Sequence, residues 1–209
     1  MMPFEQTGYV IVRGAIQRDV ADLLARYTLF DQGQRFITEG EVSQVANTHS
    51  KYADPLTEAL LQQLHPTIEQ HTGLRLLPTY SYYRLYEVGS VLKKHTDRPS
   101  CEISTTICLG FNYMEADYQW PIFMDGYPVN MQPGDLVIYK GCELQHWREQ
   151  FNAPIGSWHS QAFMHYVDAD GSNAEFKYDK RPAIGYNPQD TVSKLRIDKK
   201  IRQGFFDSK

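Results

Sequence analysis

The stretch that decides the predicted fold is YYRLYEVGSVLKKHTD, at positions 82–97. An aromatic run leads into a Gly-containing turn, and a short segment then ends on His95 and Asp97. Side chains two residues apart on a strand point to the same side, so both of these residues can face the inside of a barrel. An isolated His-X-Asp triplet is common, and its usual explanation is a surface pair. The sequence elsewhere in the chain therefore decides between a surface pair and a metal site.

A second stretch, QPGDLVIYKGCELQHWR at positions 132–148, supplies a third ligand. A Pro-Gly-Asp turn precedes an apolar strand, and His146 follows after a short loop. Two imidazoles and one carboxylate on adjoining strands can occupy one face of an octahedral metal ion and leave the opposite face open, which is typical of non-haem Fe(II) sites. We therefore predict that His95, Asp97 and His146 bind a metal ion and are the catalytic residues.

Length and charge narrow the class of protein. The chain has 209 residues, enough for one domain with a sizeable core, and no linker divides it. We expect a single domain over 1–209, with its core at about 75–168. The formal net charge is −4 and the sequence pI is about 6.0, so no broad surface for polyanions is indicated. A basic cluster over 194–202 is interrupted by Asp198 and favours a solvated helix face, so nucleic acid is unsupported as a partner.

Cysteine usage and hydropathy indicate the compartment. Cys101, Cys108 and Cys142 show no Cys-X-X-Cys spacing, which argues against a disulfide framework and fits a reducing environment. The first residues show no basic region followed by an apolar stretch, and no apolar run approaches the length of a membrane span. We expect a soluble, cytoplasmic protein without a membrane partner.

The N-terminal third is expected to contain one strand and two helices. A β-branched run predicts a strand over 8–14, and apolar residues at helical spacing predict a helix that includes 20–27, followed by a loop over 33–50. Asp54 and Pro55 are typical of a helix start, and Gly73 of a helix end. The apolar stripe of this second helix is Leu56, Leu60, Leu64 and Ile68. Pro66 is expected to kink or divide the helix, because proline removes an internal donor.

From residue 75 onward the pattern changes to short strands separated by turns. We predict strands near 77–87, 91–96, 102–111, 120–124, 127–131, 135–139, 144–149 and 157–167. Such a succession suits a barrel or a sandwich, supported on one face by the preceding helices. A last helix is predicted over 189–203.

Between about residue 80 and residue 168, these motifs together resemble the Fe(II)/2-oxoglutarate-dependent oxygenase superfamily, and within it the prolyl 4-hydroxylase-like branch. The resemblance implies an α+β fold with a double-stranded β-helix (jelly-roll) core and N-terminal supporting helices. It also implies Fe(II), 2-oxoglutarate as co-substrate and O₂, with ascorbate as a stimulating reductant.

The activity implied by the resemblance is that of a dioxygenase. It would hydroxylate an unactivated C–H bond of an amino-acid side chain or a small molecule, and release succinate and CO₂. The substrate would be a small molecule or a peptide. Two alternatives stay open: a cupin-like metalloenzyme, such as an isomerase or a dioxygenase that does not use 2-oxoglutarate, and a metal-free ligand-binding barrel, which the intact ligand positions disfavour.

The co-substrate residues follow the family only in part. In that branch a tyrosine before the first histidine binds the distal carboxylate of 2-oxoglutarate, and Tyr86 matches it. The family's basic residue on the last core strand falls on Ser157, which is a departure, so another cation is required. We expect Arg148 first, because it lies two residues beyond His146, and Arg84 second. Either arginine can instead form a structural ion pair with Glu87, Glu102 or Glu149.

The remaining polar residues near the site are weaker candidates. Arg98 and Glu102 can contact substrate or pair with each other. His165 is expected to be structural, and His159 is either structural or part of the pocket. The other histidines, His49, His65 and His71, are expected to face solvent.

Overall fold

The computed structural model describes residues 4–34, 45 and 48–186. The helix predicted over 189–203 and the basic cluster over 194–202 lie outside these residues. Among the described residues, no helix combines the length and the apolar character needed to cross a membrane.

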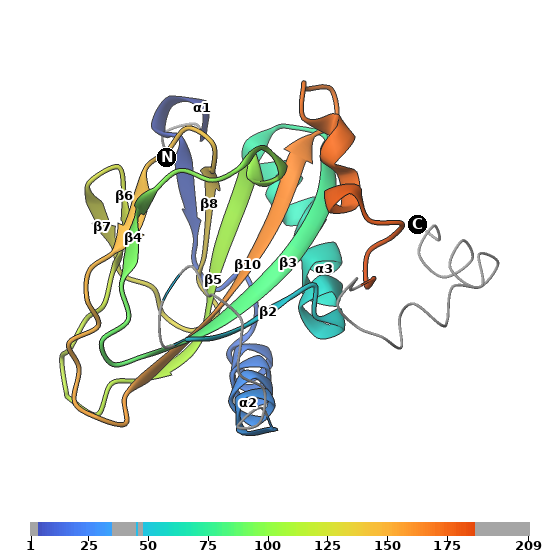
Figure 1. Cartoon of the computed structure of the whole chain (residues 1–209). Coiled ribbons are helices and arrows are strands. Elements are labelled where there is room, and N and C mark those ends of the chain that lie inside the picture. The colour runs from blue at the N-terminus through green and yellow to red at the C-terminus, as the bar shows by residue number, and fades with distance from the viewer. Residues whose placement is uncertain (1–3, 35–44, 46–47, 187–209) are drawn as a thin grey trace.

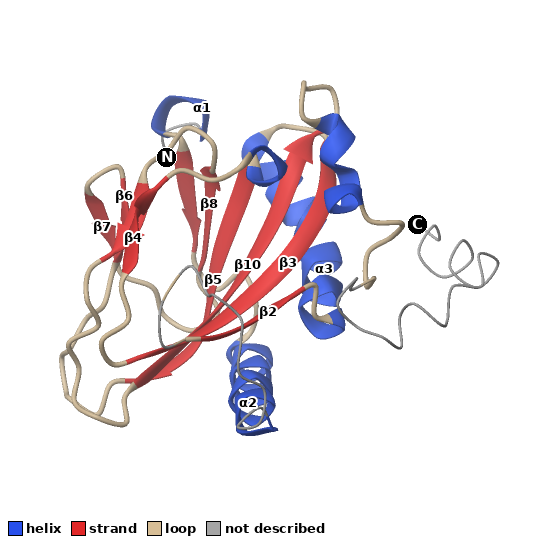
Figure 2. Cartoon of the chain, in the orientation of Figure 1, coloured by secondary structure: helices blue, strands red, loops and turns tan. Residues whose placement is uncertain are grey.

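Two antiparallel sheets face each other and form the body of the molecule (Figures 1 and 2). The larger sheet has the order β1-β8-β5-β10-β3-β2 and the smaller one the order β4-β9-β6-β7. Every strand predicted between 77 and 167 is present. The larger sheet consists of β1 (Tyr9–Val12), β2 (His49–Tyr52), β3 (Leu76–Glu87), β5 (Ile103–Asn112), β8 (Leu136–Lys140) and β10 (Trp158–Asp168). The smaller sheet consists of β4 (Leu92–His95), β6 (Ile122–Met124), β7 (Tyr127–Val129) and β9 (His146–Arg148).

The inner strands β3, β5, β8 and β10 of the larger sheet are buried along most of their length, and successive side chains contact opposite faces of the sheet. On β10, Ala162, Met164 and Tyr166 pack into the cluster shared with the helices, whereas Phe163 belongs to a cluster between the sheets. Helices α2 (Arg18–Gln34) and α3 (Pro55–Thr72) cover the face turned away from the smaller sheet. The space between the two sheets is thereby left for polar as well as apolar side chains.

Helix α3 begins and ends as the sequence predicts. Asp54 caps it, its side chain accepting a hydrogen bond from the backbone N–H of Leu56 at 3.0 Å, and Gly73 closes it with a φ of 73°. Pro66 lies inside the helix without dividing it, so the alternative in which proline splits the helix is wrong. Neighbouring residues keep the helix continuous because its buried stripe, Leu60, Leu64 and Ile68, holds both halves against the sheet.

The loop predicted over 33–50 differs from the structure at its two ends, and residues 35–44, 46 and 47 of it lie outside the described residues. Helix α2 extends to Gln34, and β2 adds an edge strand to β3, with His49 opposite Leu85 and Tyr52 opposite Tyr82. The β2 sequence, HSKY, has no apolar alternation, so its strand conformation comes from pairing with β3 and not from its own propensity.

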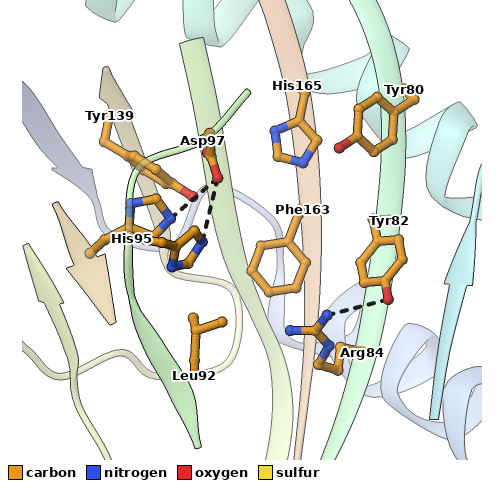
Figure 3. A pocket seen from close by; sticks show the side chains of 10 residues that line it. Tyr80, Tyr82, Arg84, Leu92, His95, Asp97, Tyr139, Phe163 and His165 are labelled. Carbon is orange, nitrogen blue, oxygen red and sulfur yellow. Dashed lines mark hydrogen bonds and ion pairs between the residues drawn. The ribbon is translucent and has the colours of Figure 1, made fainter. Parts of the chain in front are cut away.

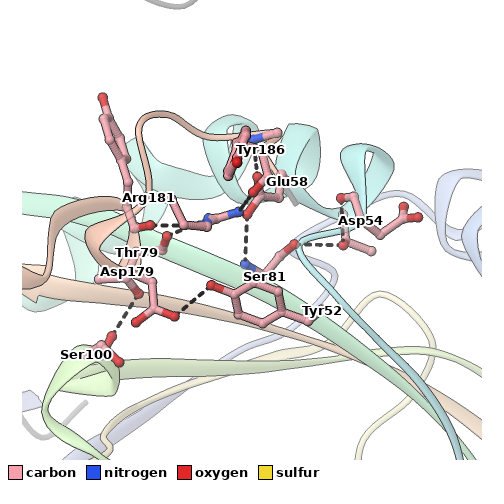
Figure 4. A network of polar contacts seen from close by, with 12 residues as sticks. Tyr52, Asp54, Glu58, Thr79, Ser81, Ser100, Asp179, Arg181 and Tyr186 are labelled. Atoms are coloured by element: carbon pink, nitrogen blue, oxygen red, sulfur yellow. Dashed lines mark hydrogen bonds and ion pairs between the residues drawn. The ribbon is translucent and has the colours of Figure 1, made fainter. Parts of the chain in front are cut away.

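Short helical segments complete the described chain: α1 (Phe4–Thr7), η1 (Pro99–Cys101) and η2 (Ala174–Lys180). A buried ion pair fixes the segment after η2 (Figure 4), because Arg181 contacts Glu58 of α3 at 2.6 Å and donates to the carbonyl of Thr79 at 2.8 Å. Residues 171–186, for which we predicted no secondary structure, are thus attached to the outer side of the barrel.

Candidate metal centre

The three predicted ligands come together at one end of the space between the sheets (Figure 3). His95 ends β4 and lies directly opposite His146, the first residue of β9, while Asp97 follows β4 by two residues. The Nε2 atoms of His95 and His146 lie 3.6 and 3.5 Å from Oδ1 of Asp97. One ligand atom from each residue lies within 4.8 Å of the others, close enough to share a single ion.

Backbone carbonyls fix the tautomers of both imidazoles. Nδ1 of His95 is 2.7 Å from the carbonyl oxygen of Lys93, and Nδ1 of His146 is 3.1 Å from that of Leu144. A carbonyl oxygen only accepts, so the proton of each neutral ring resides on Nδ1. Both Nε2 lone pairs are then directed toward Asp97, which is the arrangement that metal-ligating histidines require.

Asp97 is held so that one oxygen faces the histidines. Its backbone N–H donates to the carbonyl of Gly141 at 2.8 Å, and the hydroxyl of Ser104 donates to Oδ2 at 2.6 Å. Burial alone raises the pKa of this carboxyl, but its interaction with the His146 and His95 rings in their protonated form outweighs burial and holds the pKa well below its usual range. The carboxylate is therefore ionised and available to a cation at neutral pH.

Gly141 is the residue that lets Asp97 approach so closely. A Cβ atom at this position would lie 2.1 Å from the carbonyl oxygen of Cys101 and 2.7 Å from Oδ2 of Asp97. No side chain fits there, because both distances are far inside van der Waals contact. The Lys140–Gly141 turn thus depends on glycine for packing.

A cavity of about 180 Å³ opens beside the three ligands. Its wall is mainly aromatic, and it also includes one cationic side chain, Arg84 (Figure 3). The sequence did not single out most of these wall residues, because nothing in their spacing distinguishes them from core residues. Besides the three ligands and Arg84, the lining consists of Tyr80, Tyr82, Leu92, Tyr139, Phe163 and His165.

Arg84 and Tyr86 both have buried polar atoms without a protein partner. Arg84 is 3% exposed and its Nε has no hydrogen bond, while its Nη2 reaches only the hydroxyl of Tyr82, at 3.3 Å. The hydroxyl of Tyr86 is also unpartnered, and its ring lies 5.5 Å from the Arg84 guanidinium. Unpaired buried donors are costly, so the cavity wall at Arg84 is suited to an anionic ligand, whereas Tyr86 is not among the residues that line the cavity.

Arg148 is fully buried but does not line the cavity. Its Nη1 donates to the carbonyl of Trp120 at 2.5 Å, and its Nη2 to Oε1 of Gln161 at 2.6 Å. Neither Arg148 nor Arg84 forms an ion pair with any carboxylate of the described residues, so pairing with Glu87, Glu102 or Glu149 is not observed.

Ser157 and His159 lie near the same end of β10. The hydroxyl of Ser157 donates to the carbonyl of Tyr113 at 2.5 Å, a neutral contact that leaves this position without a charge. His159 is buried opposite Tyr86, and its ring nitrogens lie 2.8 Å from the hydroxyl of Tyr113 and 2.9 Å from Oε1 of Gln161. His159 therefore has a structural environment.

Several expectations about outlying residues are corrected. Arg98 does not pair with Glu102: it binds Asp179 through two contacts of 2.9 and 2.8 Å. His49 does not face solvent, because it lies 3.1 Å from Asp31 and 3.2 Å from the hydroxyl of Tyr83. His65 is partly buried and contacts the carbonyl of Leu76. The partners of Arg98 and His49 lie on other elements of the fold, and that of His65 lies on the strand after its own helix, so sequence spacing does not reveal them.

Comparison with known proteins gives structural matches only. No family model matches the chain, and no curated protein matches its sequence. A Pseudomonas putida prolyl-4-hydroxylase aligns with a TM-score of 0.59 at 17% identity, covering 79% of this chain and 95% of that one. The non-heme alpha-ketoglutarate-dependent carbocyclase SnoK of nogalamycin biosynthesis aligns with a TM-score of 0.62 at 13% identity, covering 80% and 82%.

A prolyl hydroxylase of Trichoplax adhaerens, in complex with a peptide fragment of hypoxia inducible factor, aligns with a TM-score of 0.59 at 12% identity. The alignment covers 79% of this chain and 86% of that one. The chain therefore has the double-stranded β-helix fold of these enzymes, and the fold predicted from the resemblance is confirmed. Such low identities establish the fold alone.

Replacing Asp97 by Ala should weaken divalent-metal binding by more than about 100-fold, because a direct ligand counts for more than its supporting residues, whose loss costs roughly 10–100-fold. Isothermal titration with Co(II) measures this. Asp170→Ala is the matched control, since Asp170 forms an exposed pair with Arg75 far from the site. Equal Co(II) affinity in the Asp97 variant and the wild type would remove Asp97 from the metal centre.

Metal affinity should fall as the pH is lowered from about 8 to about 6. Burial lowers the pKa of His95, but its hydrogen bond to Asp97 outweighs this and the pKa is raised above 6.5. Below that raised pKa, a proton on His95 competes with the metal ion. Asp97 stays ionised over this pH range, so it does not contribute to the pH dependence of metal affinity. Co(II) titrations across this range should show up to about a tenfold loss per pH unit for each proton displaced. A flat profile contradicts coordination by His95.

Proposed function

We propose that this protein is an Fe(II)- and 2-oxoglutarate-dependent oxygenase. The observation that carries the proposal is a single cavity with two different ends. At one end, two Nε2 lone pairs and one carboxylate oxygen converge on a common point. Elsewhere in its wall lies a buried arginine with an unpaired donor. A metal chelator that carries a second, distal carboxylate matches both features.

The donor set fits iron. Two imidazoles and one carboxylate from neighbouring strand ends leave the cavity side of the ion open to other ligands. When bound, iron and 2-oxoglutarate supply the oxidising chemistry that uses O₂, yields succinate and CO₂, and hydroxylates a C–H bond. Ascorbate acts as a reductant that keeps the iron ferrous.

The orphaned donors fit the distal carboxylate of the co-substrate. Nε of Arg84 and the hydroxyl of Tyr86 each lack a hydrogen-bond partner, and both are buried. A carboxylate accepting from both would satisfy two costly donors at once. Arg84 therefore takes precedence over Arg148 in this role, because the Arg148 guanidinium already donates to Trp120 and Gln161.

The protein's own residues orient the metal ligands and shield the metal site from water. Ser104 and Gly141 hold Asp97 in place, and the carbonyls of Lys93 and Leu144 hold the two histidines. The aromatic wall, which includes Tyr139 and Phe163, limits water near the ion. Arg148 connects the two sheets, because it lies on β9 and donates a hydrogen bond to Gln161 of β10.

The substrate class follows the prolyl 4-hydroxylase-like branch: an amino-acid side chain, free or in a peptide, or another small molecule. One structural neighbour holds a peptide fragment, and another is a carbocyclase of nogalamycin biosynthesis, so the fold serves both classes. Cys101, Cys108 and Cys142 are all free, in keeping with the proposed cytoplasmic location.

The protein supplied with Fe(II), ascorbate, O₂ and 2-oxoglutarate should form succinate slowly even without a prime substrate. Mass spectrometry of succinate measures this, and Asp97→Ala is the matched inactive control. If the iron-loaded wild type forms no more succinate than the variant, the alternative interpretation is favoured. In that interpretation the protein is a cupin-like metalloenzyme that does not use 2-oxoglutarate.

The two arginines can be separated by paired substitutions of similar volume. Arg84→Met should raise the KM for 2-oxoglutarate at least tenfold, because removing a charged partner from a buried carboxylate costs about 2–5 kcal/mol. Tyr86→Phe should raise it several-fold, in line with the loss of one hydrogen bond. Arg148→Met should lower the melting temperature of the protein and leave the KM for 2-oxoglutarate nearly unchanged. The reverse pattern, with KM changed only by Arg148→Met, would assign the clamp to Arg148.

A further inference from the structure

A chain of three side chains, buried His165, buried Ser104 and partly buried Asp97, runs from the wall of the cavity to Oδ2 of the Asp97 carboxylate. Nδ1 of His165, on β10, is 2.9 Å from Oγ of Ser104, on β5. The same Oγ is 2.6 Å from Oδ2 of Asp97. His165 is 6% exposed and Ser104 fully buried, so water does not compete for these contacts. Figure 3 shows the His165 ring facing the cavity beside Asp97.

Counting protons gives the chain a direction. Ser104 has one hydroxyl proton, and its nearest acceptor is the ionised Oδ2 of Asp97, which takes it. The carbonyl of Cys101, 3.0 Å from the same hydroxyl, is also only an acceptor. His165 must therefore donate to Ser104, which places its ring proton on Nδ1.

This tautomer leaves Nε2 of His165 as an acceptor. No hydrogen bond to that nitrogen is found among the described residues, and the side chain lines the cavity. The neighbouring Tyr80 ring packs against the imidazole in a tilted contact, with centroids 4.6 Å apart and an interplanar angle of 38°. The nitrogen therefore faces the space beside the metal ligands with a free lone pair.

We propose that His165 is a positioning residue that orients Asp97 through Ser104 and presents Nε2 to the substrate as a hydrogen-bond acceptor. The proposal rests on the metal centre proposed above, and it deepens that function by favouring substrates that carry an N–H or O–H beside the reacting carbon. It also gives His165 a role beyond packing.

A competing arrangement has to be separated from this one. Asp97, Cys101 and His165 also offer three ligand atoms within 4.8 Å, so His165 could bind the ion directly. One contact opposes that arrangement: the Cys101 thiol, which would be its third ligand, lies 3.2 Å from the hydroxyl of Tyr80. Burial also raises the pKa of Cys101 to about 12, which disfavours the thiolate that a metal requires.

A double-mutant cycle on Co(II) affinity distinguishes a His165 that acts through Ser104 from a His165 that binds the ion directly. Ser104→Ala should lower affinity about 10–100-fold, as the loss of a residue that supports a ligand does. His165→Phe should lower it by a smaller factor, and the double variant should be no weaker than Ser104→Ala alone, because His165 acts through Ser104. His165→Asn, whose amide N–H can replace Nδ1–H, should restore most of the loss.

Thr105→Val is the matched control for the cycle. Its hydroxyl is also buried between β5 and β10, but it donates to the carbonyl of Met164 at 3.0 Å and not toward the metal centre. Co(II) affinity should be unchanged. Additive losses in the double variant, or a loss in Cys101→Ala as large as that in Ser104→Ala, would make His165 a direct ligand and overturn the proposal.

Nitrogen-15 NMR of histidine-labelled, metal-free protein tests the tautomer independently of metal binding. His165, assigned by its absence in His165→Asn, should be neutral with its proton on Nδ1, and Ser104→Ala should shift the population toward Nε2–H. An Nε2–H ring in the wild type would overturn the proposal. Failure of Co(II) to bind the wild type would instead count against the proposed function.

Discussion

A carboxylate buried at the junction of the two sheets is the constraint on which the site depends. Burial alone would favour the neutral form of Asp97, so its charge persists only because donors surround it. Two imidazoles face Oδ1, a serine hydroxyl binds Oδ2, and a glycine leaves the room that this packing needs. Each partner comes from a different segment, so the carboxylate ties β4, β5 and β9 together where a metal would sit.

Alternation along β3 and β10 lets one pair of strands serve both the core and the site. Tyr83 and Met164 face the helices and join the apolar cluster there, whereas Arg84 and His165 face the cavity. A shift of one residue in the β3–β10 pairing would exchange these sets and bury the polar groups against α3. The helices therefore matter to the site indirectly: their apolar stripes make that shift costly, and so they hold the register of the functional face.

The sequence predicted most of the barrel and the three residues that the structure brings together as candidate metal ligands, because both predictions depend on local patterns. Strand boundaries followed from alternation and turns, and His95, Asp97 and His146 from their placement at strand ends. It did not predict β2, whose HSKY sequence becomes a strand only through pairing with β3. It ranked Arg148 before Arg84 from the spacing to His146, because only the three-dimensional contacts show that Arg148 already has acceptors.

The buried guanidiniums of Arg148 and Arg84 have no carboxylate partner among the described residues, but they differ in the other contacts that stabilise their charge. Arg148 is solvated by two fixed carbonyl dipoles and lies over the Trp120 ring, at 4.6 Å, so its charge is stabilised before any ligand arrives. Arg84 has only one long contact and two tyrosine rings, at 5.2 and 5.5 Å. The difference between the two arginines is therefore one of free donors: Nε of Arg84 has no hydrogen-bond partner and Arg84 lines the cavity, whereas Arg148 lies outside the lining with two acceptors in place. An anion that enters the cavity can bind at Arg84 without displacing an existing strong hydrogen bond, which is why the co-substrate role is proposed for Arg84.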